Sequence, residues 1–355
     1  MYLRLSILAL CLIGALPARA AEPAAIVRAA IESVIQPGYD AFADKAAALT
    51  QATEQLCSAP SFPALEKTHR AFGEALIAWG HVEFIQFGPV RDENRLERIM
   101  FVQDRKGIAL RQIQAMLAEQ EREALKPGAL AGKSVAVQGF PALEFVLFGT
   151  GAEQIGFGAD GYRCLLGAAI ASNLQKIAHD LADAWHDPKG ITALLETPGE
   201  KNPLYRTDGE ALGAILKTLP DGYELIVETR LKPFIGDSPL TAEPKKALLW
   251  RSASTLPLLR SNYEGLAAIA KKSGALKELE GENAAIAANF PFENSAALSA
   301  LDAFKTSLPD AATTPEGHDR LAYLLVVTKS LRDISQRGVL GAHGLSAGFS
   351  SLDGD

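Results

Sequence analysis

Glu144 is the single acidic residue in a mostly apolar run of the chain, between Val137 and Gly149. Carboxylates are rarely buried unless they are paired with a cation, hydrogen-bonded or coordinated to a metal. On a helix, Phe140, Glu144 and Leu147 would share the face that packs. Burial there raises the pKa of a carboxyl unless an arginine, a lysine or a metal lies beside it. The segment predicts either a polar site residue or a buried structural ion pair.

Arginines that could pair with such a carboxylate follow a Gly-Pro helix stop. Among Arg91, Arg95 and Arg98, the last two share a helix face. An arginine pair could hold the Glu144 carboxylate or an anionic ligand. The alternative is a surface salt-bridge cluster with the neighbouring acids, which are Asp92, Glu93 and Glu97.

Trp250 and Arg251 offer a second possibility from the other half of the chain. They could supply a stacked or hydrogen-bonded partner for a site between the two halves. The alternative is a core tryptophan that happens to precede a solvated arginine. The sequence leaves both interpretations open.

Residues with metal-ligand spacing are scarce. The six histidines form no His-Glu-x-x-His or His-x-x-Glu motif, whereas a zinc peptidase needs about three protein ligands and an open position. His179, Asp183 and His186 stand at i, i+4 and i+7, so they would share a helix face and could ligate a divalent metal. The alternative is a solvated helix end, because further acidic residues crowd the same region.

The first twenty residues have the features of a secretory signal. Arg4 gives a positive start, residues 5–16 are apolar, and Ala18-Arg19-Ala20 is a small-x-small cleavage site. Cys11 follows Leu10, where a lipoprotein signal requires a small residue, so a lipid anchor at Cys11 is disfavoured. We therefore expect a signal peptide over 1–20, cleavage after it, and a soluble periplasmic protein.

The charge and the cysteines of the exported chain limit its partners. The full chain carries a net charge of −7, and removal of Arg4 and Arg19 leaves 33 basic against 42 acidic residues. That balance argues against nucleic acid as a partner. Two cysteines remain, Cys57 and Cys164, and an oxidising compartment permits a disulfide between them. The sequence leaves this pairing open.

Helical periodicity dominates the elements that must position these residues. Convincing alternating strands are absent, so we predict an all-α fold of two tandem helical bundles, over 21–187 and 188–355. We expect Pro37-Gly38 to end the first helix and Pro220-Asp221-Gly222 to interrupt a later one. Ser61 is a predicted N-cap. The predicted helices are 24–35, 39–57, 62–87, 107–124, 134–148, 162–185, 208–231, 244–272, 276–289, 295–307 and 315–336.

Several motifs occur in an order that spans nearly the whole mature chain. They are Cys57-Ser-Ala-Pro, Ala71-Phe72 to Trp79, 83–89, Arg95-Leu-Glu-Arg98 with Asp104, 134–144, Trp250-Arg251-Ser252 and 344–354. Together they resemble the imelysin family of periplasmic proteins. Gly139 and Glu144 match its Gly-x-His-x-x-Glu signature, but Pro141 stands where the histidine would be. The chain is most similar to a branch that lacks this histidine.

The resemblance implies an exported two-bundle protein with a site near the interface of the bundles. It links the chain to iron-regulated uptake, and some family members are classed as metallopeptidases. Proline has no ligand atom, so chemistry that requires histidine at this position is lost. Our leading hypothesis is a non-enzymatic binding role in periplasmic iron acquisition, with membrane-associated uptake components as partners. The polar pocket would be lined by Glu144, Gln138, Gly139, Arg91, Arg95 and Arg251.

Two alternatives to this hypothesis remain. A metallopeptidase could draw its ligands from elsewhere in the chain, with iron or another divalent metal as cofactor. A scaffold could dock to a membrane-anchored uptake partner without any small ligand, and a broad exposed apolar patch would favour that role.

Overall fold

The computed structural model describes residues 22–102, 107–277 and 279–346, which contain helices, turns and coil but no strand. The all-α fold class is therefore confirmed for these residues. The predicted signal segment, including Cys11, lies outside them. Within the described ranges, no helix combines the length and the apolar character that crossing a membrane requires.

The first half of the chain is built around the helix α2, which packs between α3 and α7. The helix α6, which carries Glu144, packs against α7. Fully buried aromatic side chains fill the space between these helices, with Phe42 in contact with both Trp79 and Phe140. The helices of this half are α1 (Pro23–Ala30), α2 (Gln36–Ser58), α3 (Phe62–Gly80), α4 (Arg95–Ile99), α5 (Ile108–Glu119), α6 (Gly139–Phe148) and α7 (Gly161–His186). The short helix α8 (Ile191–Glu196) follows the predicted boundary at residue 187 and packs back against α1 and α7.

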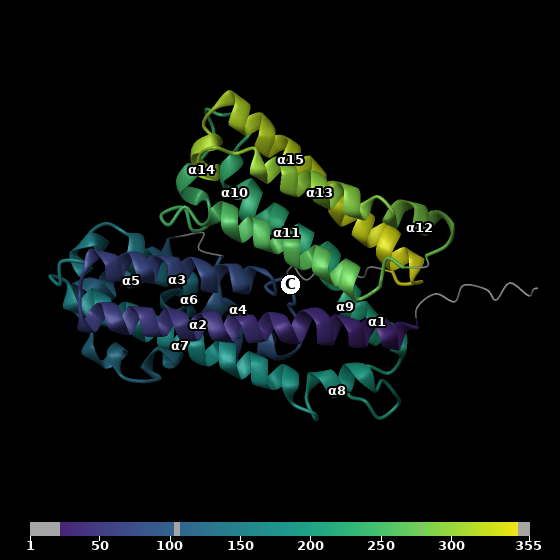
Figure 1. Ribbon diagram of the computed structural model, residues 1–355, viewed down its shortest axis with the longest axis horizontal. Coiled ribbons are helices and arrows are strands. Elements are labelled where there is room, and N and C mark those ends of the chain that lie inside the picture. The colour runs from purple at the N-terminus through teal and green to yellow at the C-terminus, as the bar shows by residue number, and fades with distance from the viewer. Residues whose placement is uncertain (1–21, 103–106, 278, 347–355) are drawn as a thin grey trace, which may run out of the picture.

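The second half forms a bundle of four long helices, α9, α11, α13 and α15, each packed against two others. Its core includes the buried ring of Tyr223, which contacts the buried rings of Tyr263 and Phe290. Figure 1 shows this bundle as a layer above the helices of the first half. Its helices are α9 (Asp208–Leu225), α10 (Lys232–Ile235), α11 (Thr255–Lys272), α12 (Gly281–Ala287), α13 (Phe290–Asp302), α14 (Leu308–Ala311) and α15 (Pro315–Asp333).

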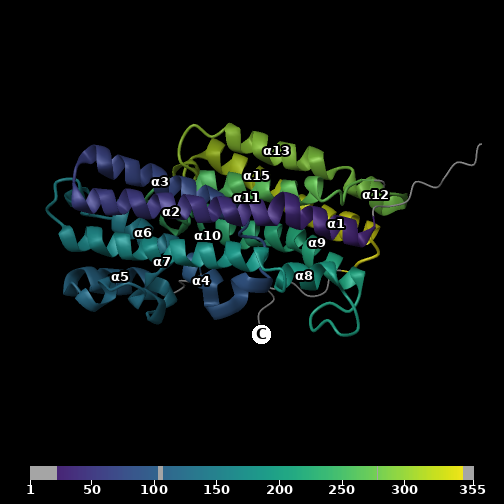
Figure 2. The ribbon, with the colours of Figure 1, turned by 60° about the horizontal axis from the view of Figure 1, so that its bottom comes forward.

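The prediction that Pro37-Gly38 ends the first helix is wrong. A π-helical turn over Ile31–Ile35 joins α1 directly to α2, and Pro37 then lies at the start of α2. The wider turn changes the hydrogen-bond pattern just where proline lacks an N–H, so the chain continues as one helix. Figure 2 shows α1 and α2 in line. Gly38 is required for packing, because a Cβ there would lie 2.4 Å from Cγ1 of Val82.

The predicted interruption at Pro220-Asp221-Gly222 is also absent, since α9 runs through Pro220. A proline in a helix interior costs about 3 kcal/mol. Packing outweighs this cost here, because Pro220 is buried and Gly222 lies against Leu266 and Phe84. By contrast, the predicted N-cap is confirmed: Ser61 Oγ accepts a hydrogen bond from the Ala64 amide at 3.3 Å.

The two halves meet along α3 and α11, and also where α1 packs against α9. The contact between α3 and α11 is close because it is made at glycines. A Cβ at Gly80 would lie 2.0 Å from Ser261 Oγ, and one at Gly265 would lie 2.5 Å from the His81 carbonyl oxygen. Larger residues at either glycine would separate the halves.

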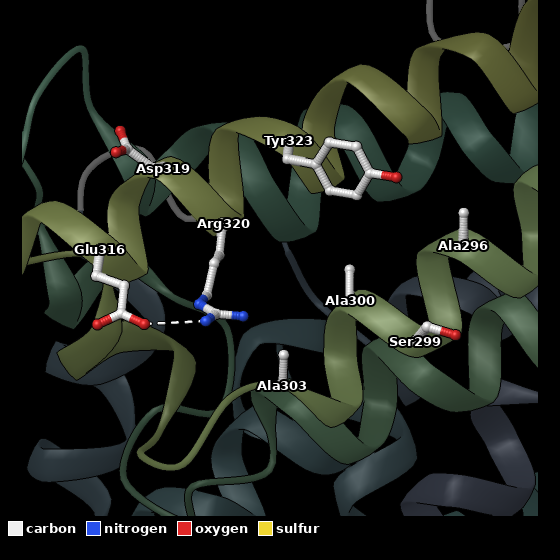
Figure 3. Close-up of a pocket in the computed structure, with 8 residues that line it drawn as sticks. All are labelled: Ala296, Ser299, Ala300, Ala303, Glu316, Asp319, Arg320 and Tyr323. Atoms are coloured by element: carbon white, nitrogen blue, oxygen red, sulfur yellow. Dashed lines mark hydrogen bonds and ion pairs between the residues drawn. The ribbon is translucent and has the colours of Figure 1, made fainter.

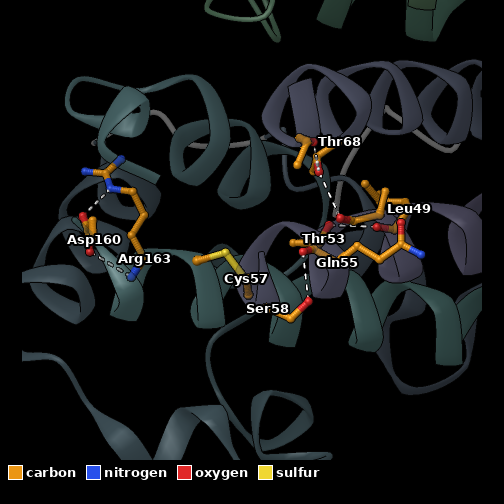
Figure 4. Close-up of a disulfide and its surroundings, with 11 residues drawn as sticks. Leu49, Thr53, Gln55, Cys57, Ser58, Thr68, Asp160 and Arg163 are labelled. Carbon is orange, nitrogen blue, oxygen red and sulfur yellow. Dashed lines mark hydrogen bonds and ion pairs between the residues drawn. A yellow bond between two sulfur atoms is a disulfide. The ribbon is translucent and has the colours of Figure 1, made fainter. Parts of the chain in front are cut away.

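Cys57 and Cys164 form a disulfide, which answers the question that the sequence left open. It joins the end of α2 to the start of α7 and closes a loop with a sequence separation of 107 residues. Figure 4 shows the bond between these helices, near the Asp160–Arg163 ion pair. The loop that it closes contains α6 and therefore Glu144.

Candidate functional site

Glu144 is buried, with 3% of its surface exposed, and its closest partner comes from the other half of the chain. Its Oε1 accepts hydrogen bonds from the backbone amide and from the hydroxyl of Ser252, both at 2.9 Å. Nη1 of Arg251 lies 3.9 Å from Oε2. The carboxylate of the first half is thus bound by a short segment of the second half.

The backbone at Gly139 places α6 in position to present Glu144. Gly139 has φ +69°, and a Cβ there would lie 2.2 Å from the carbonyl oxygen of Ile99. Only glycine fits this combination of left-handed backbone and close approach. Pro141 occupies the first turn of α6, where its missing N–H leaves no intrahelical bond unmade. The proline therefore starts the helix instead of breaking it.

The segment that binds Glu144 has a strained backbone on both sides. Leu249 and Ala253 have φ values of +58° and +54°, in the left-handed region. That conformation costs a residue with a Cβ about 1–2 kcal/mol. Hydrogen bonds from Ser252 to Glu144 and from the Ser254 amide to the Leu249 carbonyl (3.1 Å) hold the turn. Strain of this kind, maintained by surrounding contacts, is typical of functional sites.

Arg251 lies between aromatic rings beside the buried carboxylate. Its guanidinium carbon is 4.6 Å from the ring centroid of Trp250 and 5.3 Å from that of Phe145. Lys245 Nζ lies 5.9 Å from the Trp250 centroid. The Arg251 side chain keeps 23% of its surface exposed. The site therefore combines one buried carboxylate with two cations arranged around an aromatic surface.

Burial raises the pKa of Glu144 above its ordinary value, and the hydrogen bonds from Ser252 and the charge of Arg251 oppose part of that shift. The folded chain therefore binds this proton more tightly than the unfolded chain. Since the unfolded carboxyl loses its proton first, the free energy of unfolding falls as pH rises from the ordinary glutamate pKa through the raised one.

We expect Glu144→Gln to remove this decline, because glutamine keeps an acceptor for Ser252 and carries no charge. Urea unfolding from pH 4 to pH 8 should show the variant gaining stability relative to the wild type as pH rises. Glu54→Gln, at an exposed position on α2, is the control. A stability difference between Glu144→Gln and the wild type that stays constant over this range would contradict the expectation.

Gln138 does not contact Glu144 but connects α4 to α7. Its Oε1 accepts hydrogen bonds from Arg98 Nε and Asn173 Nδ2, both at 3.0 Å. Its Nε2 donates to the Lys133 carbonyl at 2.9 Å. Since its whole amide is occupied by neighbouring residues, Gln138 orders the start of α6.

Arg91 and Arg95 also make their contacts away from Glu144. Arg91 lies 3.7 Å from Glu97, and Arg95 donates to the Pro89 carbonyl at 3.0 Å. These are the local salt-bridge and backbone contacts of the alternative considered from the sequence. Of the predicted pocket residues, the structure brings Arg251 to Glu144 and leaves these two arginines in their own segment.

The side chains of His179, Asp183 and His186 are not gathered around one point in the structure. Within the described residues, no three or more His, Cys, Asp or Glu side chains are grouped closely enough to hold a metal ion. His186 Nε2 instead lies 3.0 Å from a carboxylate oxygen of Asp40 on α2. All three residues lie on α7, as their spacing predicted, but residues on one helix are not enough to surround a metal ion.

A second buried acid, Glu83, was not predicted as a site residue. It forms an ion pair with Arg230, and both side chains are almost fully buried. Asn262 Nδ2 donates to the other carboxylate oxygen at 3.2 Å and to the Gly80 carbonyl at 2.8 Å. Like Glu144, Glu83 belongs to the first half and is bound by residues of the second. The sequence carried the same signal as for Glu144, because Glu83 is a lone acid next to the apolar residues Val82, Phe84 and Ile85.

Comparison with known proteins identifies the family of this chain. The profile described as Peptidase_M75: Imelysin matches residues 35–334, most of the chain.

The chain belongs to the imelysin family.

Individual proteins are similar to this chain over most of its length. Iron-regulated protein A of Synechococcus elongatus is 24% identical over 323 residues, which cover 87% of this chain and 84% of that protein. A crystal structure of an imelysin-like protein from Psychrobacter arcticum has a TM-score of 0.77 at 17% identity and covers 93% of this chain and 98% of that one. A putative iron-regulated protein A precursor from Parabacteroides distasonis has a TM-score of 0.71 at 13% identity, with coverages of 92% and 97%. Both structures share the fold of this chain.

A surface cleft in this imelysin-family chain lies apart from the predicted site residues. It has a volume of about 570 Å³ and is formed by α13, the residue that follows it, and α15. Figure 3 shows Tyr323 and the Glu316–Arg320 ion pair on α15 facing small residues of α13. The eight lining residues are Ala296, Ser299, Ala300, Ala303, Glu316, Asp319, Arg320 and Tyr323. None of them was predicted from the sequence as a site residue. The candidate site considered below is therefore the one around Glu144, at the junction of the halves.

Proposed function

We propose that this chain is an exported binding protein of iron acquisition, without enzymatic activity, that holds its ligand at the junction of its two halves. The observation that carries the proposal is the buried Glu144 carboxylate, bound by Ser252 across that junction. The family membership and the iron-regulated names of two relatives support the connection with iron. Cleavage of the signal segment and a membrane-associated uptake partner are parts of the same proposal.

In this proposal the buried and the exposed residues of the site have different tasks. Glu144 holds the strained turn through Ser252, while Arg251 and Trp250 present the surface that meets the ligand. Gly139 sets the start of α6, and Gln138 orders the residues before it. Arg91 and Arg95 contribute through the fold of the segment between α3 and α4.

The test is iron uptake in a strain that lacks this gene, complemented with the wild type, Glu144→Gln or the surface control Glu54→Gln. In Glu144→Gln the hydrogen bonds from Ser252 go to a neutral acceptor in place of a charged one, which costs on the order of 1 kcal/mol. If the turn that presents Arg251 is loosened by this amount, ligand affinity falls by about fivefold, and we expect the same loss of uptake at limiting iron. Uptake of radioactive iron and the iron content of periplasmic protein are the measurements. Equal uptake with the wild type and with Glu144→Gln, both present at equal levels, would reject the site.

The description of the family as a peptidase favours a second candidate, a metallopeptidase. That function predicts cleavage of a protein substrate by the purified chain, and inhibition of the cleavage by a metal chelator. Iron uptake that depends on Glu144, without chelator-sensitive cleavage, would support the binding role over the peptidase.

A further inference from the structure

The exposed groups of the candidate site are cationic and aromatic, although its buried group is a carboxylate. Oε1 of Glu144 already accepts two hydrogen bonds from Ser252. Arg251, at 3.9 Å from Oε2, is beyond hydrogen-bond distance of that oxygen. Oε1 of Glu144 is therefore occupied by the fold. The partly exposed Arg251 is the group of this site that can meet an anionic ligand.

The guanidinium of Arg251 is stacked but donates no hydrogen bond to any described residue. Stacking against Trp250 and Phe145 fixes the plane of the guanidinium. Arginine has five N–H donors in a fork that matches the oxygens of a carboxylate. A held arginine with unused donors is suited to an anionic oxygen ligand.

A second cation strengthens the same preference. Lys245 Nζ lies within cation–π distance of the Trp250 ring and forms no ion pair with a described residue. The next residue, Lys246, pairs with Glu243 instead. Around Trp250, the two cations Arg251 and Lys245 outnumber the one buried carboxylate, so the local field favours negative charge.

The backbone of the turn supports a role beyond packing. Leu249 and Ala253 are two of the five non-glycine residues with positive φ in the described chain, and they flank Trp250, Arg251 and Ser252. Fixing the turn in this conformation places the arginine and the tryptophan on the surface side of the buried carboxylate. Preorganised groups of this kind reduce the entropy lost on binding.

We propose that the ligand of this site is an iron complex with net negative charge, recognised through its oxygen-rich chelator by Arg251, Lys245 and the Trp250 ring. This inference rests on the proposed function in iron acquisition and names the chemical class of its ligand. The protein would bind the chelator's carboxylate or phenolate oxygens, and the chelator would keep its hold on the iron.

Trp250 provides the readout. The other two tryptophans, Trp79 and Trp185, have no exposed surface, whereas Trp250 is partly exposed. Quenching of tryptophan fluorescence in the oxidised mature chain therefore reports on this site. Trp250→Phe gives the optical background. The probes are ferric citrate as an anionic iron complex, ferrioxamine B as a cationic one, and citrate without iron.

We expect the wild type to bind ferric citrate at least about tenfold more tightly than ferrioxamine B, because only the anion pairs with the cations. Arg251→Met and Lys245→Met should each weaken ferric citrate binding, Arg251→Met by about tenfold or more. Lys246→Met, a neighbouring lysine whose charge is already paired, should leave it unchanged.

Three outcomes would overturn the inference. Equal binding of both iron complexes, unaffected by Arg251→Met, would reject the anionic class while leaving iron binding intact. Equal affinity for citrate with and without iron would show a carboxylate site that does not select iron complexes. Failure of the wild type to bind either iron complex, or iron itself by elemental analysis, would reject the proposed function as well.

Discussion

Arg230→Met is expected to lower the free energy of unfolding by about 3–5 kcal/mol, because it leaves the Glu83 carboxylate buried without its cation. Both side chains are enclosed between the halves, and Asn262 alone cannot replace the lost charge. Glu83→Leu should lower the free energy of unfolding by a similar amount, because it leaves the Arg230 guanidinium buried without its carboxylate. Urea unfolding monitored by circular dichroism measures both losses.

The double variant Glu83→Leu/Arg230→Met should recover most of the lost stability. A buried ion pair has a large desolvation cost, and here Arg230 Nε has no hydrogen-bond partner among the described residues. Arg320→Met is a matched control, because its partner Glu316 is on the surface and such pairs contribute about 1 kcal/mol or less. If Arg230→Met costs no more than this control, the buried pair does not hold the halves together.

Reduction of the disulfide is expected to cost about 4–5 kcal/mol, as estimated from loop closure over about a hundred residues. The bond joins Cys57 on α2 to Cys164 on α7, the two helices with the most extensive contact in the first half. It also restrains the part of the chain that carries Glu144. The measurement is the urea midpoint of the oxidised protein with and without a thiol reductant.

The double variant Cys57→Ala/Cys164→Ala separates loss of the bond from other effects of the reductant. Its stability should match that of the reduced wild type and should not respond to the reductant. An oxidised wild type whose midpoint is unmoved by full reduction would show that helix packing alone holds α2 against α7.

The sequence predicted the parts of the fold that depend on neighbouring residues. Helical periodicity gave the all-α class, and the cap at Ser61 depends on Ala64, three positions away. The two proline signals failed because their outcome depended on other parts of the structure. A π-turn before Pro37 allowed the helix to continue, and packing at Gly222 outweighed the cost of Pro220.

For the candidate site, the sequence identified the acid but not its main partner. A lone acid in an apolar run is a local signal, so the burial of Glu144 could be predicted. Ser252 could not, because its short side chain reaches Glu144 only after two segments 108 residues apart have folded together. Arg230 is 147 residues from Glu83, and nothing near it in the sequence indicates a partner. A lone acid in an apolar stretch also describes Glu83. The same argument would therefore have predicted the burial of Glu83, but not its partner Arg230.

The continuous helix from α1 to α2 limits how the molecule can move. At 1.5 Å per residue the rod is roughly 50 Å long. Its first turns pack on α9, and the rest packs on α3 and α7, so it belongs mechanically to both halves. A hinge that swung the halves apart would have to bend this rod. Sliding of α11 along α3 by about an ångström would leave this rod straight. It would also shift the turn that carries Ser252 relative to Glu144.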